Sequence, residues 1–251
     1  MRHEGTGNPR PGQGAARVAV VTGASRGIGR AVARRLAADG LLVVAVGRDE
    51  AALKETATAD EERISTLACD VTDEEQVAER IGGRDRVDVL VNNAGAASSA
   101  RVDRTPLDEW AGLMAVNATA PFLCTRAVVG GMRERGWGRI VTVASVAGLA
   151  GAPYIAAYAA SKHAAVGLMR AVAAELRGTG VTANSVCPAY VRTEMTERTI
   201  ANIVRRTGRT AEEAAAALGT ILDPAAVADA VAWLAGDGAA AVNGREIVLD
   251  G

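Results

Sequence analysis

The sequence predicts a doubly wound α/β fold, in which helices cover both faces of a seven-stranded parallel sheet. From residue 17 onward, short apolar runs alternate with longer helical stretches. Each run is apolar on both faces, as in strands that are buried between two layers of helices. A glycine-rich turn joins the first run to the first helix. Right-handed crossovers between successive strands complete the predicted arrangement.

Seven segments have the composition of buried strands: 17–22, 41–46, 64–69, 87–91, 139–145, 181–186 and 245–250. Helices are predicted between them at 27–40, from Asp49 onward, after Thr72, and at 108–134, 155–177 and 224–235. Gly40 ends the first helix. Thr72 to Glu75 has the pattern of a capping box, Thr105 precedes a first-turn proline, and Asp223 precedes another.

Composition excludes several classes of protein. The chain has 251 residues, 49% of them hydrophobic, and a formal net charge of −1. That balance fits neither a disordered chain nor a polycation that binds nucleic acid. The three cysteines lack CxxC spacing, so neither a disulfide framework nor a metal site is expected. No apolar run approaches the roughly 20 residues of a membrane span. We therefore expect a cytoplasmic protein.

The chain is predicted to consist of a flexible N-terminal tail, residues 1–16, and one domain, residues 17–251. The segment 190–222 stands apart, because it has no predicted strand and contains a helical stretch at 211–219. It follows the carboxyl end of the sixth strand, where open α/β sheets bind their ligands. We expect a substrate lid there, and an ordinary packed helical excursion is the alternative.

The turn from Thr22 to Gly29 has the spacing of a phosphate-binding loop. Gly23 permits the sharp turn, Gly27 lets the backbone approach a pyrophosphate, and Gly29 lets the helix pack against the strand. The anion then lies on the amino end of the helix that follows. The predicted cradle also includes Ser25, Arg26 and Ile28. A merely structural turn is the alternative, but strand, turn and helix occur together.

The end of the second strand indicates which dinucleotide is bound. A carboxylate there would accept the adenosine ribose hydroxyls of NAD, but the position is held by Gly47, and Arg48 follows. Arg26 in the glycine turn is a second guanidinium, and guanidinium groups bind phosphate bidentately. The sequence therefore favours NADP(H). Asp49 is the acid instead if the strand ends two residues later.

A tyrosine and a lysine suggest acid–base chemistry. Tyr158 and Lys162 are spaced i, i+4 and so share one face of a helix. An ammonium group beside a phenol is expected to lower the phenol pKa. Ser145, at the end of the fifth strand, can hydrogen bond to the same substrate oxygen. Alone, each residue is more often an ordinary surface or turn residue.

These motifs together resemble those of the short-chain dehydrogenase/reductase family. They are TGASRGIG (22–29), NNAG (92–95), Asn117 in MAVNATAPF, Ser145, YAASK (158–162) and CPAYVRTEM (187–195). The resemblance covers residues 17–251 and implies a Rossmann fold. It implies that Tyr158 is the general acid/base, that Ser145 polarises the carbonyl, and that Lys162 binds the nicotinamide ribose. Asn117 would hold a water in the proton relay.

The resemblance also implies the remaining contacts with the cofactor. Asp70 would bond to the adenine amine, Asn92 would stabilise the central sheet, and Pro188 and Thr193 would flank the nicotinamide carboxamide. The other expected cofactor residues are Val71, Asn93, Ala94, Gly95 and Val191, together with Tyr158 and Lys162. Ala189 departs from the family, which usually has glycine there. The chain also stops at Gly251, so subunit contacts made by a longer tail are in doubt.

Within the family, residues 130–145, 158–167 and 184–195 look most like bacterial β-ketoacyl reductases. Such enzymes reduce a 3-oxoacyl thioester carried by CoA or by a carrier protein. Arginines near the site mouth could meet a phosphopantetheine or CoA phosphate, although a solvated helix face is the alternative: Arg192, Arg198, Arg205, Arg206 and Arg209. Met195, Ile200 and Tyr190 are candidate residues of an acyl pocket.

The sequence therefore predicts an NADPH-dependent carbonyl reductase or alcohol dehydrogenase. One alternative is an NADP-linked dehydrogenase of another secondary alcohol, a sugar or a steroid-like substrate. Another is a non-catalytic cofactor sensor, which would have no use for an intact set of Asn117, Ser145, Tyr158 and Lys162. No nucleic acid or membrane partner is expected. The resemblance implies a homotetramer or homodimer formed by the helices at 108–134 and 155–177.

Overall fold

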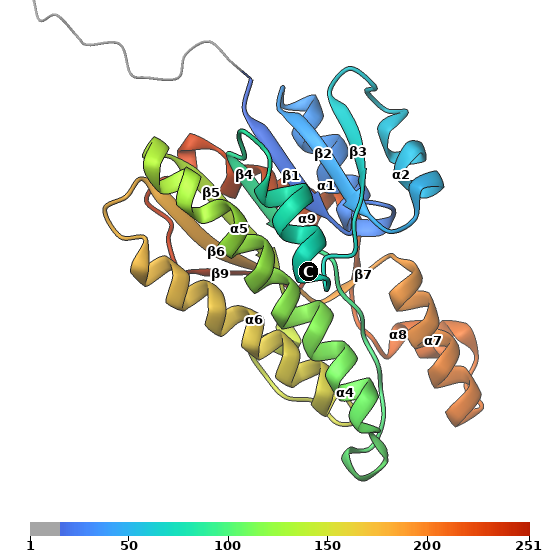
Figure 1. Ribbon diagram of the computed structural model, residues 1–251. Helices are drawn as coiled ribbons and strands as arrows, with labels where there is room; N and C mark the ends of the chain where they lie inside the picture. The colour runs from blue at the N-terminus through green and yellow to red at the C-terminus, as the bar shows by residue number, and fades with distance from the viewer. Residues whose placement is uncertain (1–15) are drawn as a thin grey trace, which may run out of the picture.

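The computed structural model describes residues 16–251, so nearly all of the expected tail lies outside the described residues. Within them, parallel strands form one sheet in the order β3-β2-β1-β4-β5-β6-β9 (Figure 1). The strands are β1 (Val18–Thr22), β2 (Leu42–Gly47), β3 (Ile64–Ala68), β4 (Val89–Asn92), β5 (Gly138–Val143), β6 (Val181–Pro188) and β9 (Glu246–Leu249). The predicted fold class is confirmed.

Two helical layers cover the sheet, because alternate side chains of each strand enter different cores. In β1, Ala19 and Val21 belong to the core beneath α1 (Gly27–Ala38), α2 (Glu50–Ala57) and α9 (Pro224–Ala235). Val20 belongs to the core beneath α3 (Glu74–Val77), the π-helical turn η1 (Ala78–Gly82), α5 (Ala120–Arg135) and α6 (Ala156–Glu175). Strands buried on both sides explain the continuous apolar runs of the sequence.

Three aspartates cap helices through their side chains. Asp49 accepts from the N–H of Ala52, and Asp223 accepts from that of Ala225, as their positions before helices predict. Asp73, not Thr72, caps α3, so the predicted capping box is wrong. The prediction at Thr105 is also wrong. Pro106 is the N-cap of α4 (Leu107–Met114), and no described side chain caps that helix.

The helix predicted at 108–134 is interrupted. α4 leads into the π-helical turn η3 (Ala115–Thr119), and α5 follows. The whole run Leu107–Arg135 is long and apolar enough to cross a membrane by length and composition. Core helices of soluble proteins pass the same test, and Leu123 and Val128 of α5 are buried against the sheet. Packing against the sheet accounts for part of this apolar composition, since 44% of the most apolar 18-residue window is buried.

The segment 190–222 contains more regular structure than predicted. Two short strands, β7 (Tyr190–Val191) and β8 (Ile221–Leu222), pair in parallel at its base, so the expectation of no strand there is wrong. Between them lie α7 (Glu194–Thr207), which was not predicted, and α8 (Ala211–Ala216). Both helices stand out from the sheet in Figure 1. We call this unit the lid segment.

β1 lies between β2 and β4. Successive strands are therefore added on one side of β1 up to β3 and on its other side from β4 onward, so the strand order reverses here. Open α/β sheets bind ligands at such a switch point, beyond the carboxyl ends of the strands. The glycine turn after β1 and the loop after β4 both lie there. Short 3₁₀ turns occur in the connecting segments at Val102–Arg104 (η2), Val146–Gly148 (η4) and Asp237–Ala239 (η5).

Candidate active site

β1 leads directly into the predicted phosphate-binding turn. Gly23 has φ +64° and Gly27 has φ +55°, a backbone region that L side chains rarely adopt. A Cβ on Gly23 would also lie 2.8 Å from the Cα of Ala94. None of the described side chains caps the amino end of α1. Its first N–H groups and the helix dipole can therefore hold an anion.

Thr22 and Asn93 join this turn to the loop after β4. The Thr22 hydroxyl accepts the N–H groups of Asn93 and Ala94 at 3.0 and 3.1 Å. Asn93 Nδ2 donates in return to the carbonyls of Thr22 and Gly23, at 3.0 and 3.2 Å. This role of Thr22 was not predicted, because a threonine that ends a buried strand looks like an ordinary β-branched strand residue.

A glycine ends β2, and a side chain at this position would require the Ser25 hydroxyl to turn away. β2 ends at Gly47, as expected, and a Cβ there would lie 2.5 Å from the hydroxyl oxygen of Ser25. The alternative acid, Asp49, caps α2, where its Oδ1 accepts the N–H of Ala52 at 3.1 Å. A glycine therefore holds the position that would discriminate between the two dinucleotides.

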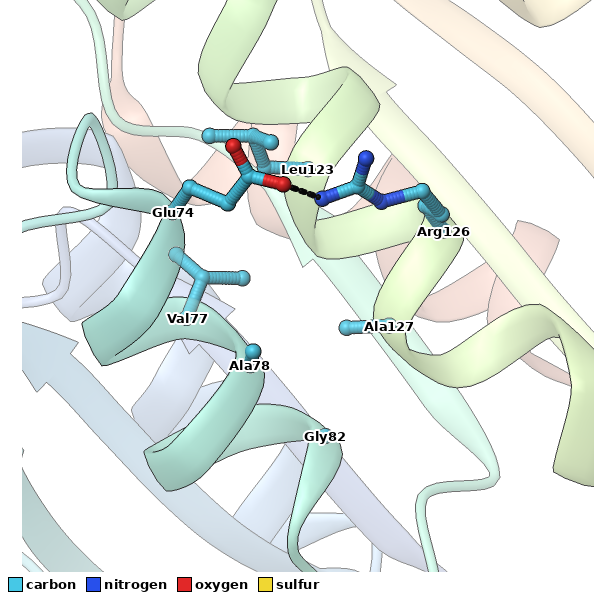
Figure 2. Close-up of a pocket in the computed structure, with 7 residues that line it drawn as sticks. All are labelled: Glu74, Val77, Ala78, Gly82, Leu123, Arg126 and Ala127. Carbon is cyan, nitrogen blue, oxygen red and sulfur yellow. Dashed lines mark hydrogen bonds and ion pairs between the residues drawn. The ribbon is translucent and has the colours of Figure 1, made fainter.

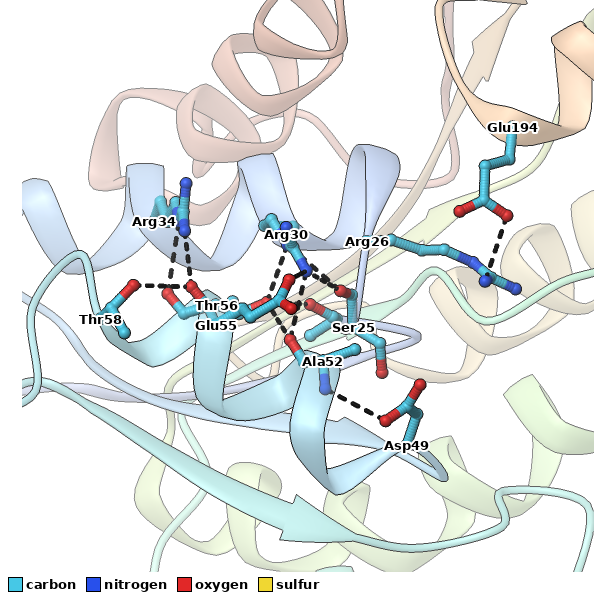
Figure 3. A network of polar contacts seen from close by, with 11 residues as sticks. Ser25, Arg26, Arg30, Arg34, Asp49, Ala52, Glu55, Thr56, Thr58 and Glu194 are labelled. Atoms are coloured by element: carbon cyan, nitrogen blue, oxygen red, sulfur yellow. Dashed lines mark hydrogen bonds and ion pairs between the residues drawn. The ribbon is translucent and has the colours of Figure 1, made fainter.

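The two guanidinium groups expected near the adenosine phosphate both lie beside carboxylates. Arg26 Nη1 is 3.1 Å from Glu194 Oε2, an ion pair drawn in Figure 3. Arg48 Nη1 is 3.9 Å from Asp70 Oδ2. Both arginines are well exposed, so their head groups can exchange partners at modest cost.

A third arginine, Arg30, connects the glycine turn to α2 through its side chain (Figure 3). Its Nε donates to the carbonyl of Ser25 and to the hydroxyl of Thr56, each at 3.1 Å. Its Nη2 forms an ion pair of 3.0 Å with Glu55. Arg30 thus ties the glycine turn to α2. Arg30 was not among the predicted site residues, since an arginine in the first turn of a helix is ordinarily solvated.

Ser145, Tyr158 and Lys162 meet at the carboxyl end of β5. Ser145 is buried, its hydroxyl accepts the N–H of Ala147 at 3.1 Å, and it lies close enough to the Tyr158 phenol to lower the pKa of that group. Lys162 is buried one helical turn beyond Tyr158, and its Nζ donates to the carbonyl of Val143 at 3.0 Å. That Nζ lies 5.9 Å from the centroid of the Tyr158 ring. The three side chains therefore share one site, as their spacing predicts.

Burial sets the proton affinities at this site. It raises the pKa of Tyr158, an effect that the Ser145 hydroxyl opposes and Tyr190 reinforces. It also lowers the pKa of Lys162 to about 8. The expectation that Lys162 depresses the pKa of Tyr158 is wrong for this structure. The Lys162 ammonium is turned to the Val143 carbonyl, and desolvation of the phenolate outweighs the other influences.

Asn117 lies in η3 and is almost fully buried. Its Oδ1 accepts the N–H of Ala96 at 3.0 Å, and its Nδ2 donates to the Ala96 carbonyl at 2.8 Å and to the Ser161 hydroxyl at 2.9 Å. The Ser161 hydroxyl donates to the carbonyl of Tyr158 at 2.8 Å. Asn117 thus clamps the loop after β4 to α6, and sequence analysis had missed Ser161.

The other residues named by the NNAG motif lie at the same edge of the sheet. Asn92 Nδ2 lies 3.3 Å from the hydroxyls of both Thr125 and Thr142, which links β4 to α5 and β5. A Cβ on Gly95 would lie 2.8 Å from Asn117 Oδ1 and 3.5 Å from Lys162 Nζ. Gly95 therefore brings its backbone against two of the predicted catalytic residues.

Asp70 and Val71 follow β3, the edge strand that pairs with β2. Asp70 Oδ1 accepts the N–H and the hydroxyl of Thr72 at 3.0 and 2.7 Å. These bonds hold the pKa of the Asp70 carboxyl below its usual value. Asp70 is therefore an anion with a fixed orientation, and Val71 is buried next to it.

The residues after β6 join the site to the lid segment. The carbonyl of Pro188, which ends β6, lies 3.5 Å from the Ser145 hydroxyl. Val191 is buried in β7, and its carbonyl accepts the hydroxyls of Thr193 and Thr196 at 3.2 and 2.6 Å. Thr193 is the N-cap residue of α7. The predicted nicotinamide-side residues therefore lie between Ser145 and the start of α7.

The basic residues of the lid segment are only partly available for a ligand. Three of them bond to the protein: Arg198 with Glu194, Arg205 with Asn202 at 2.8 Å, and Arg206 with the carbonyl of Ser99 at 3.2 Å. Arg192 and Arg209 are exposed. Of the candidate acyl-pocket residues, Met195 and Tyr190 are exposed and Ile200 is half-buried.

A hollow on another part of the surface is shown in Figure 2. It lies between the α3–η1 segment and α5, and an ion pair of 2.6 Å between Glu74 and Arg126 spans it. The rest of its lining is apolar or small: Val77, Ala78, Gly82, Leu123 and Ala127. None of the predicted site residues lines it, so it is separate from the candidate active site.

Comparison with known proteins identifies the family to which this chain is similar. The family model described as short chain dehydrogenase matches residues 17–204. The chain is 38% identical to a putative ketoacyl reductase of Streptomyces coelicolor, over 93% of this chain and 95% of that protein. It is 35% identical to a D-beta-hydroxybutyrate dehydrogenase of Rhizobium meliloti, over 94% and 97%. A crystal structure of a variant actinorhodin polyketide ketoreductase with NADPH matches with a TM-score of 0.88 and 38% identity, over 94% and 96%.

Proposed function

Because this chain belongs to the short-chain dehydrogenase family, we propose that it is an NADPH-dependent carbonyl reductase. The observation that carries the proposal is the meeting of Ser145, Tyr158 and Lys162 beside a glycine turn that can hold a pyrophosphate. A hydroxyl, a phenol and a buried ammonium at one point are suited to protonate a carbonyl oxygen. The resemblance to ketoacyl reductases supports the direction of the reaction.

The residues at the turn fit a dinucleotide that carries a 2′-phosphate. The backbone at Gly23 and Gly27 and the amino end of α1 offer N–H groups to the pyrophosphate. Gly47 presents no carboxylate to repel an extra phosphate, and the guanidinium groups of Arg26 and Arg48 can bind it. When bound, this cofactor supplies the hydride that reduces the carbonyl carbon.

Tyr158 acts as the general acid. Its raised pKa keeps the phenol protonated at neutral pH. The phenol proton passes to the carbonyl oxygen as the carbon accepts the hydride, and Ser145 donates a hydrogen bond to the same oxygen. Lys162, charged below its pKa of about 8, would bind the nicotinamide ribose rather than act on the phenol, since its ammonium donates to the Val143 carbonyl.

The substrate is proposed to be a 3-oxoacyl thioester or a related ketone. The names of the relatives support an oxygen on the third carbon of an acyl chain, since both ketoacyl reductases and a β-hydroxybutyrate dehydrogenase are among them. Exposed arginines of the lid segment, Arg192 and Arg209, are positioned on the element that would meet a carrier's phosphate. The hydroxybutyrate relative favours a second candidate, the oxidation of a small 3-hydroxy acid.

The deciding experiment measures the loss of NADPH absorbance with a panel of ketones. We expect turnover with 3-oxoacyl-CoA substrates and slower turnover with acetoacetate. Tyr158→Phe should lower kcat by at least 10²-fold while NADPH still binds. Tyr154→Phe removes the same hydroxyl from an exposed side chain and should retain turnover. Full activity of Tyr158→Phe would contradict the proposed mechanism, and turnover of acetoacetate alone would favour the second candidate.

We also propose that the chain forms a homo-oligomer through α4–α5 and α6. Trp110 and Phe122 expose apolar surface on the first of these units, at 40% and 43%. Large apolar side chains on a helix surface favour association with another copy.

A further inference from the structure

Glu194 places a negative charge at the entrance of the phosphate-binding turn. It is the first residue of α7, and its neighbour Thr193 packs on the turn: a Cβ on Gly27 would lie 3.2 Å from the Thr193 methyl carbon. A carboxylate here stands beside the same anion-binding helix end that is proposed to hold the pyrophosphate. The placement needs an explanation, because it disfavours an anionic ligand.

Two arginines neutralise this carboxylate. Glu194 Oε2 is 3.1 Å from Arg26 Nη1 and 3.2 Å from Arg198 Nη2. One oxygen thus receives two guanidinium groups, one from the glycine turn and one from the next turn of α7. Figure 3 shows the Arg26 side chain extended from the turn toward Glu194.

Arg26 is at the same time one of two guanidinium groups available for a 2′-phosphate. A phosphate dianion is a stronger bidentate acceptor for arginine than one carboxylate oxygen. The Arg26 and Glu194 side chains are 64% and 50% exposed, so their pairing is weak and can be exchanged. Arg198 would remain on Glu194 after the exchange, so the carboxylate would not be left without a cation.

We propose that Glu194 is a specificity-determining residue that competes with the 2′-phosphate of the cofactor for Arg26. The inference rests on the proposed use of NADP(H). Glu194 binds Arg26 in the free protein. The 2′-phosphate therefore increases cofactor affinity, relative to a cofactor without this phosphate, by less than it would if Arg26 were unpaired. As a result, Glu194, the first residue of α7, is released from Arg26 when the phosphate is bound.

The test compares equilibrium binding of two cofactor fragments to the protein without turnover. Isothermal titration gives Kd values for adenosine 2′,5′-bisphosphate and adenosine 5′-monophosphate, and their ratio isolates the 2′-phosphate. Glu194→Gln should raise the preference for the bisphosphate about two- to fivefold, the range expected for one exposed ion pair. In an Arg26→Met background, Glu194→Gln should leave the ratio unchanged, because the guanidinium for which Glu194 and the phosphate compete is absent.

Glu197→Gln is the matched control. It removes the same charge one turn later on α7, and the described residues include no ion-pair partner for Glu197. The control should alter the ratio by less than the main variant. An unchanged ratio in Glu194→Gln, or an equal change in the Arg26→Met background, overturns the inference. A wild-type protein that binds both fragments equally contradicts the proposed cofactor as well, which separates the two failures.

Discussion

Replacing Asn117 by alanine tests whether this side chain holds the site together. The replacement removes three hydrogen bonds, to both backbone groups of Ala96 and to the hydroxyl of Ser161. A buried polar group left without a partner costs about 1–3 kcal/mol. The Ala96 groups are only partly buried, so water can replace some of the loss. We therefore expect a decrease of roughly 3 kcal/mol in the free energy of unfolding.

Urea and thermal unfolding measure this effect. For a chain of this size, about 1 kcal/mol corresponds to a Tm shift of about 2–4 °C, so Asn117→Ala should melt roughly 6–12 °C below the wild type. Ser161→Ala removes one of the three bonds and should cost about 1 kcal/mol. Wild-type stability of Asn117→Ala together with lost turnover would refute the clamp and favour the expected water relay.

Two other predictions concern Lys162 and Gly47. The folded pKa of Lys162, about 8, lies below its ordinary value of 10.5, so the unfolded chain binds more protons between these values. The unfolding free energy of the wild type relative to Lys162→Met should therefore rise by roughly 3 kcal/mol from pH 8 to 10.5; parallel urea-unfolding curves across that range would contradict this. Gly47→Asp should destabilise the fold by no more than about 1 kcal/mol, because the Ser25 hydroxyl that it contacts can rotate to another position. Adding Ser25→Gly should restore most of that loss, whereas additive losses in urea unfolding would argue against the contact.

The strands were predictable because each is short and buried on both faces. In β2, the four residues from Val43 to Val46 are all buried, and such a run has few other interpretations. The lid segment was harder. Only Thr196 is buried in α7, but Ile200, Ile203 and Val204 follow a helical period, so the sequence did contain a signal for this helix. The two-residue strands, by contrast, have no period at all.

The candidate site was predictable where its parts are close in sequence. Tyr158 and Lys162 are one helical turn apart, and the glycine spacing of the turn is local. The contacts that organise these parts join distant residues: Asn93 reaches Thr22 across 71 positions, and Arg26 reaches Glu194 in another element. Such pairs have no local signal and follow only from the topology of the sheet.

The π-helical turn at Ala115–Thr119 makes the site sensitive to the deletion of a single residue. A π-helical turn holds one more residue than an α-helical turn, so it has the form of a single-residue insertion within one long helix. Deleting one residue there would leave α4 and α5 able to form as one continuous helix. Because the wide turn absorbs the extra residue, the two flanking helices would keep their orientation, whereas residues within the turn would shift and Asn117 would leave Ala96 and Ser161. A one-codon deletion could therefore preserve the fold and abolish the site.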